Sequence, residues 1–164
     1  MKDKKMTKTI RMTTIFLALV GIFSITDING QSAGGGRLAG AWDTTVTIYN
    51  CATGAPIRQF ASLGIFNQGG TFTGITSGTP PAGRSPELGV WKHVKAGNYA
   101  FRFKAFLFDA AGAPVAYQVV THEIVLDDDD LNYESDGGVQ IFNMAGTQIG
   151  TGCSSAVGTR MVVE

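Results

Sequence analysis

The sequence predicts an all-β domain, folded as a single antiparallel up-and-down barrel of about eight strands. The first reason is composition, because 22 glycines and ten phenylalanines in 164 residues suit strands joined by tight turns. The second is patterning, since the conspicuous segments alternate with period two or are short apolar runs between turn residues. A β-sandwich is the alternative that the same pattern allows.

The third reason is a repeated turn. Residues 109–112 read Asp-Ala-Ala-Gly, and residues 143–146 read Asn-Met-Ala-Gly. An Asp or Asn opens a type I turn by bonding its downstream backbone, and the glycine accepts the left-handed position that closes it. Hairpins repeated in this way favour a meander, and closing a meander into a barrel removes its exposed edges.

The strands are expected, in order, at residues 41–49, 57–66, 71–76, 89–94, 99–108, 115–126, 131–135 and 139–142, with one or two more between 147 and 163. In the first strand Trp42, Val46 and Ile48 share a face. Residues 77–86 contain three prolines, which cannot donate to a β-ladder, and therefore predict a loop across an open end or between sheets.

The strand at 99–108 has the clearest alternation. Its apolar face carries Phe101, Phe103, Ala105 and Leu107, while the other face is basic. A tight turn at residues 96–97 would place Trp91 opposite Arg102 and Val90 opposite Phe103. The next strand, 115–126, is apolar on both faces, as expected where its outer face is also covered.

The N-terminus is typical of a secretory signal peptide. Five basic residues precede an apolar run at residues 12–25, which is followed by small and polar residues. The run is shorter than the roughly 20 residues that span a bilayer, although a retained anchor is the alternative. We expect residues 1–30 to be the signal peptide, cleaved near 30–33, then a flexible Gly-rich segment at 31–39 and the barrel at 40–164.

Export and composition limit the partners. The whole chain balances 13 basic against 13 acidic residues, and without its first thirty residues it carries a net charge of −3. A mildly acidic domain lacks the basic surface that nucleic acid attracts. We therefore expect a periplasmic or extracellular protein with no nucleic-acid partner and no stable membrane span after cleavage, and with a homodimer as one possible state.

Two cysteines, Cys51 and Cys153, follow the leader. An even number in an exported chain predicts a disulfide, and two free buried thiols are the alternative. Neither cysteine has a histidine or second cysteine at zinc-ligand spacing. The four aspartates at 127–130 do not match an EF-hand loop, so a solvated turn is favoured over a calcium site. We expect no metal and no cofactor.

Gly40-Ala41-Trp42 at the first strand and Arg160 near the end of the chain resemble the lipocalin and wider calycin arrangement. The resemblance implies a closed barrel end at which Arg160 packs over the ring of Trp42. Residues 51–54, 69–71 and 84–91 also resemble a group of small exported bacterial proteins without a settled function. That second resemblance implies a compact β-barrel and no particular activity.

The candidate binding residues follow from the inward face of the expected barrel. Trp42, Phe101, Phe103 and Leu107 would line either a filled core or an apolar lumen. His122 shares an inward face of its strand, and the neighbouring glutamate points the other way, so a catalytic pair there is disfavoured.

Arg84 and Trp91 are expected at a polar lip over the open end, where the arginine would suit a carboxylate. A structural role for Arg84, pinning the loop, is the alternative. No nucleophile elbow, phosphate loop or dinucleotide motif is present, and no catalytic residue is assigned.

The sequence thus favours an exported binder of a small apolar or amphipathic molecule. A barrel enzyme of the isomerase or cyclase type, acting on a lipid-like substrate, and a partner-binding module with a filled core are the alternatives.

Overall fold

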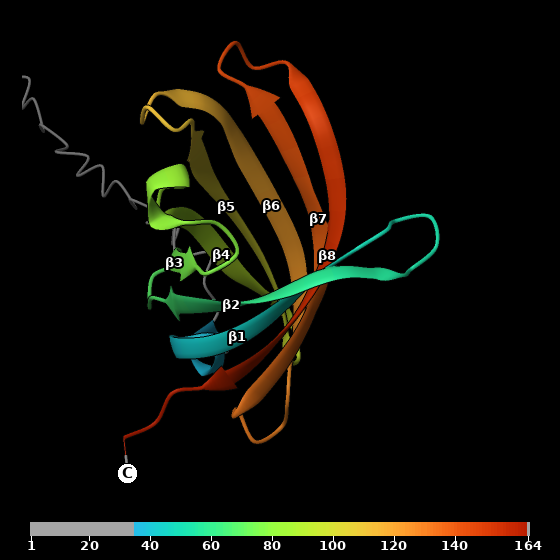
Figure 1. Ribbon diagram of the computed structural model, residues 1–164. Helices are drawn as coiled ribbons and strands as arrows, with labels where there is room; N and C mark the ends of the chain where they lie inside the picture. The colour runs from blue at the N-terminus through green and yellow to red at the C-terminus, as the bar shows by residue number, and fades with distance from the viewer. Residues whose placement is uncertain (1–34, 164) are drawn as a thin grey trace, which may run out of the picture.

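The computed structural model describes residues 35–163, which form a closed antiparallel barrel of eight strands. Each strand pairs with its neighbours in the chain, and the last pairs with the first (Figure 1). The predicted up-and-down barrel is confirmed, and the sandwich alternative is excluded. The expected signal peptide lies outside the described residues.

Two short 3-10 helices accompany the strands, one before the first strand and one between the third and fourth. The elements are η1 Gly35–Leu38, β1 Gly40–Tyr49, β2 Pro56–Phe66, β3 Thr71–Thr76, η2 Pro81–Gly83, β4 Glu87–Lys95, β5 Asn98–Phe108, β6 Pro114–Leu126, β7 Asn132–Asn143 and β8 Gln148–Arg160. The ends of β1 to β6 lie within two residues of those the sequence predicts.

The later strands differ from the prediction. β7 is one continuous strand where the sequence predicts two, and it runs through Gly137 and Gly138. A Cβ at Gly137 would collide with the backbone oxygen of Thr121 and the ring of His122 on β6. The glycine therefore permits close approach within a strand and does not end one.

The register of β4 and β5 also differs. Trp91 lies opposite Phe101, and Val90 lies opposite Arg102, one residue away from the predicted pairing. The cause is an irregularity between His93 and Lys95, which adds a residue on the β4 side of the turn. Because side chains alternate along a strand, the shift turns the Trp91 side chain into the barrel with Phe101.

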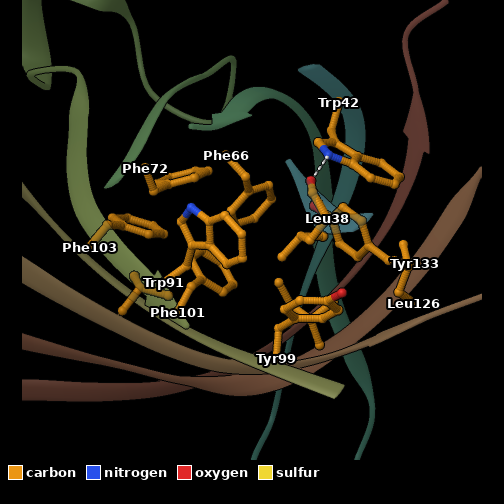
Figure 2. Packing of buried hydrophobic residues seen from close by; sticks show 12 residues of the cluster. Leu38, Trp42, Phe66, Phe72, Trp91, Tyr99, Phe101, Phe103, Leu126 and Tyr133 are labelled. Atoms are coloured by element: carbon orange, nitrogen blue, oxygen red, sulfur yellow. Dashed lines mark hydrogen bonds between the residues drawn. The ribbon is translucent and has the colours of Figure 1, made fainter. Parts of the chain in front are cut away.

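An aromatic core fills one end of the barrel, which we call the closed end (Figure 2). Its buried members are Leu38, Trp42, Phe66, Phe72, Trp91, Tyr99, Phe101, Phe103, Val120, Ile124, Leu126 and Tyr133. Phe66 is central, with ring centroids from 4.8 to 6.3 Å away on β3, β4, β5 and β7. Edge and tilted contacts of this kind contribute roughly 0.5–1.5 kcal/mol each beyond burial.

The helix η1 is part of this closure. Leu38 is fully buried, and its carbonyl accepts a 3.0 Å hydrogen bond from the indole Nε1 of Trp42. The barrel domain therefore begins before residue 40, although the sequence places residues 31–39 in a flexible segment. A single leucine among glycines gives no periodic signal in the sequence, so the buried position of Leu38 is evident only from its tertiary packing.

Arg160 packs over Trp42 as the calycin resemblance implies, with its Cζ 4.4 Å from the ring centroid. The guanidinium also donates to the carbonyls of Asp130, Ala39 and Arg37. It thus ties the end of β8 to η1 and to the β6–β7 turn.

Cys51 and Cys153 form the predicted disulfide, with Cα atoms 5.4 Å apart. The bond holds the β1–β2 turn against β8 at the end of the barrel opposite η1. Within residues 35–163, no helix is long and apolar enough to cross a membrane.

Candidate functional site: the barrel lumen

A cavity of about 320 Å³ lies between the aromatic core and the open end, which is the end opposite η1. Inward-facing residues of all eight strands line it, together with residues of the loop that follows β3. Its lining includes Val46, Ile48, Phe60, Phe72, Phe101, Phe103, Val120, Val139, Ile141 and Ala156. The barrel is therefore filled at one end and hollow at the other.

Glycines on the inward face decide where the aromatic rings lie. A Cβ at Gly64 would come 2.9 Å from the Phe72 ring, and one at Gly74 would come equally close to it and 2.6 Å from Glu87 Oε2. Phe72 therefore lies flat across two neighbouring strands. The floor of the cavity is consequently broad and aromatic, with Phe101 and Phe103 completing it.

One wall carries a buried histidine with two hydroxyl partners. His122 Nδ1 lies 3.0 Å from Ser135 Oγ on β7, and its Nε2 lies 2.8 Å from Ser154 Oγ on β8. Burial lowers the pKa of His122 to about 4. The imidazole is therefore neutral at pH 7, so one ring nitrogen donates to a serine while the other accepts.

This arrangement disfavours His122 as a general base. A base works best when its pKa lies near the working pH, and a pKa of about 4 lies well below neutral pH. Ser154 still reaches the cavity. His122 and Ser154 therefore present a neutral ring edge and a hydroxyl to the cavity.

A second part of the lining carries a buried ion pair. Arg84 Nη1 donates to Glu87 Oε1 at 2.6 Å, and both side chains are almost completely buried. The Gln118 amide oxygen, with the amide oriented to complement the guanidinium, accepts from Arg84 Nε at 3.3 Å and from Nη2. Burial raises the pKa of Glu87, and the charge and hydrogen bond of Arg84 oppose that shift.

A third polar pair lies where the cavity meets the core. Tyr133 Oη and Thr44 Oγ1 are 2.9 Å apart, and both residues are buried. Burial raises the pKa of Tyr133 to about 12, so the phenol stays protonated. Every buried side-chain N and O in the described part of the chain has a hydrogen-bond partner, as expected for a folded lumen.

The charges of the lumen largely cancel. Arg84 and Glu87 neutralise each other, and His122 and Tyr133 are uncharged at pH 7. Arg58, which is exposed near the mouth, is the remaining charged residue of the lining. The interior therefore offers apolar and aromatic surface with neutral hydrogen-bonding groups at fixed positions.

The structure separates the residues that the sequence groups together. Phe101, Phe103 and His122 line the cavity, whereas Trp42 lies below it in the closed end. Leu107 is half-buried and is absent from the lining; it forms an isolated bridge with Arg84 at the open end.

The prediction that Trp91 lies at the lip of the open end is wrong. This residue is buried in the closed end, where its indole Nε1 donates to the carbonyls of Asn67 and Thr71. The reason is the bulge in β4, together with the direction of that strand, which carries the chain away from the open end after Glu87. Arg84 does lie at the cavity, with its side chain turned inward.

Sequence reasoning missed Glu87, Gln118 and Ser154. Glu87 follows a proline and begins a strand, a position that reads as exposed. Gln118 and Ser154 lie in segments of mixed polarity. Only the closure of the barrel brings these residues toward Arg84 and His122, and the one local signal is their inward parity with Val120 and Ala156.

The aspartates at 127–130 form the β6–β7 turn at the closed end. Asp130 pairs with Arg37, whose Nε lies 2.6 Å from its Oδ1, and Asp129 accepts from the Leu131 amide at 2.9 Å. Within the described residues, no group of three or more His, Cys, Asp or Glu side chains is arranged to hold a metal ion.

No protein-family model matches the chain, and no curated protein shows significant similarity to it. Among solved structures, it is similar to the crystal structure of Rv2717c from M. tuberculosis. The two share 12% sequence identity, with a TM-score of 0.38 over 77% of this chain and 94% of that one.

Proposed function

We propose that this protein is exported and binds a small, uncharged, largely apolar molecule in its barrel lumen. The observation that carries the proposal is the cavity of about 320 Å³, closed below by aromatic rings and lined mainly by apolar side chains. Cavities of this size and lining, with a few fixed polar groups, are typical of small-molecule sites.

The polar groups favour an uncharged ligand. A ligand carboxylate would have to compete with Glu87 for Arg84, and a ligand cation would have to displace Arg84 from Glu87. Breaking a buried ion pair costs several kcal/mol. Ser154 and Gln118 can instead exchange hydrogen bonds with a hydroxyl or carbonyl of the ligand.

Glu87 favours a second candidate, an isomerase that moves a proton on an apolar substrate. Its carboxylate is buried beside the lumen, and its raised pKa would make it a stronger base than an exposed glutamate. Turnover of a bound molecule that Glu87→Gln abolishes while retaining binding would support this candidate. Unchanged turnover in that variant would exclude Glu87 as the base.

The lumen is tested with the neutral fluorophore N-phenylnaphthylamine. Phe103→Trp adds volume inside the cavity, and Phe106→Trp adds the same volume on the outer face of the same strand. Phe106 is 40% exposed. We expect the inner variant to weaken binding by about tenfold or more, because overfilling an enclosed site costs at least 1–3 kcal/mol, and the outer variant to bind like wild type.

Two results would refute lumen binding. One is equal affinity of Phe103→Trp and wild type. The other is preference for the anionic probe anilinonaphthalene sulfonate over the neutral one by a margin that persists in high salt. Absence of any binding would favour the partner-binding alternative.

Export is supported by the basic and apolar N-terminal pattern and by the disulfide between Cys51 and Cys153. The mass of the protein recovered from outside the cytoplasm checks it. We expect an N-terminus near residues 30–33 and a mass two hydrogens short of the reduced chain. An intact N-terminus would instead indicate a retained anchor.

A further inference from the structure

The open end of the barrel differs from the closed end in charge. Its rim consists of residues 50–57, 77–86, 109–115 and 143–149, which we call the open rim. The β5–β6 and β7–β8 turns belong to it and lie opposite the β6–β7 turn of the closed end (Figure 1).

Only two charged residues occur in the open rim, Arg84 and Asp109, and the exposed Arg58 borders it. Arg84 is turned inward onto Glu87 and is buried. The Asp109 carboxylate accepts hydrogen bonds from the backbone amides of Ala111 and Ala113, both at 2.9 Å, and is therefore held within its own turn. The closed end, by contrast, carries Arg37, Lys95 and the aspartates at 127–130.

The open rim also carries exposed apolar side chains. Ile57, Val115 and Ile149 are each the second residue of a strand that starts at this end, and they are 65%, 49% and 60% exposed. Met144, in the β7–β8 turn, is 48% exposed. Prolines, alanines, glycines and threonines make up much of the remainder.

The mouth of the cavity lies within this ring, since Ile48, Gly78 and Ile141 of the same end line the cavity. We propose that the open rim docks on an uncharged lipid surface, with the barrel axis pointing into it. Apolar side chains around the mouth would enter the interfacial layer, and a lipid-dissolved molecule could pass into the lumen without crossing water.

The charge pattern selects the lipid. Attraction to an anionic membrane requires a cluster of lysines or arginines at the surface, whereas the turns of the open rim have no outward-facing basic side chain, and one exposed arginine, Arg58, borders the rim. A zwitterionic phosphatidylcholine surface is therefore sufficient for docking. Adsorption is accordingly expected to depend weakly on salt.

Flotation with phosphatidylcholine vesicles tests this docking without any lumen ligand. A chain beginning at Gln31 is used, because the apolar run at residues 12–25 would itself bind lipid, and every described contact lies within residues 35–163. Ile149→Asp changes the rim, and Val90→Asp makes the same change on the outer wall of β4, where Val90 is also 60% exposed. We expect Ile149→Asp and Ile57→Asp to lower partitioning by about tenfold, and Val90→Asp to leave it unchanged.

Three outcomes would overturn the proposal: no partitioning of the wild-type chain, loss in Val90→Asp with retention in the rim variants, or partitioning that requires anionic lipid. Self-association that Ile149→Asp abolishes in the absence of vesicles would also overturn it, in favour of a second copy as the occupant. Because the neutral fluorophore measures the lumen separately, failure of docking and failure of lumen binding are distinguishable.

Discussion

At the residue scale, buried polar groups give the lumen its chemistry, and His122 is the most consequential of them. Both of its ring nitrogens have serine hydroxyl partners, and burial holds the pKa of the ring at about 4. The unfolded chain protonates this ring near pH 6.5. Between those two values the unfolded state binds more protons, so acidification through this window favours unfolding.

His122→Gln, which keeps hydrogen-bonding capacity but does not titrate, should remove this dependence. We expect the free energy of unfolding of wild type, relative to the variant, to fall by about 3 kcal/mol between pH 7 and pH 4. Chemical denaturation across that range measures it. Glu87, whose pKa is raised, contributes with the opposite sign, but it is present in both proteins and cancels. A difference that stays constant with pH would contradict the account.

The role of Gly40, in contrast to that of His122, is steric. It has a φ of +143°, and a Cβ there would lie 2.5 Å from Arg160 Nη1. Gly54 also has a positive φ, of +71°, but it faces open space. We expect Gly40→Ala to cost about 3 kcal/mol and Gly54→Ala about 1 kcal/mol, since only the first displaces Arg160 from Trp42. Equal losses on denaturant unfolding would show that backbone conformation alone matters.

At the element scale, the β1–β2 hairpin depends on a covalent bond. The β2–β3 ladder covers residues 62–66 of β2, so residues 56–61 have no β3 partner in it. The tip of the β1–β2 hairpin projects from the barrel wall (Figure 1). The Cys51–Cys153 bond, across 102 residues, holds its turn against β8.

Replacing both cysteines by serine should lower the free energy of unfolding by about 4 kcal/mol on the loop-entropy model. Thermal melting of the variant beside wild type measures the loss. Hydrogen exchange should locate the added mobility in β1 and β2 near residues 48–58 and leave the closed end protected. Uniform loss of protection around the barrel would contradict the local role of the bond.

Elements with strong alternation could be predicted from the sequence, and elements fixed by contact could not. β5 alternates Phe101, Phe103 and Ala105 without interruption, so its bounds and inward face are confirmed. β7 contains two glycines that lie close to neighbouring strands, Gly137 to β6 and Gly138 to β8, and a local pattern cannot distinguish such glycines from a turn. The predicted register between β4 and β5 was wrong for a related reason, because the sequence composition does not reveal a β-bulge.

At the scale of the whole molecule, the barrel divides into a packed end and a hollow end. The closed end is packed with rings and tied by Arg160, while the open half keeps a cavity beneath a rim with few charged residues. Fold class, disulfide and two lumen phenylalanines follow from the sequence. Glu87 and Ser154 do not, since a barrel assembles its lumen from residues far apart in the chain.

The central claim, that the lumen holds a small uncharged molecule, is tested most directly by native mass spectrometry of the protein made in an oxidising compartment, compared with the same sample denatured. We expect an extra mass that disappears on denaturation, that is reduced or absent in Phe103→Trp and that is retained in Phe106→Trp. Identical native and denatured masses in samples from several growth media, or an extra mass that Phe103→Trp retains in full, would contradict the claim.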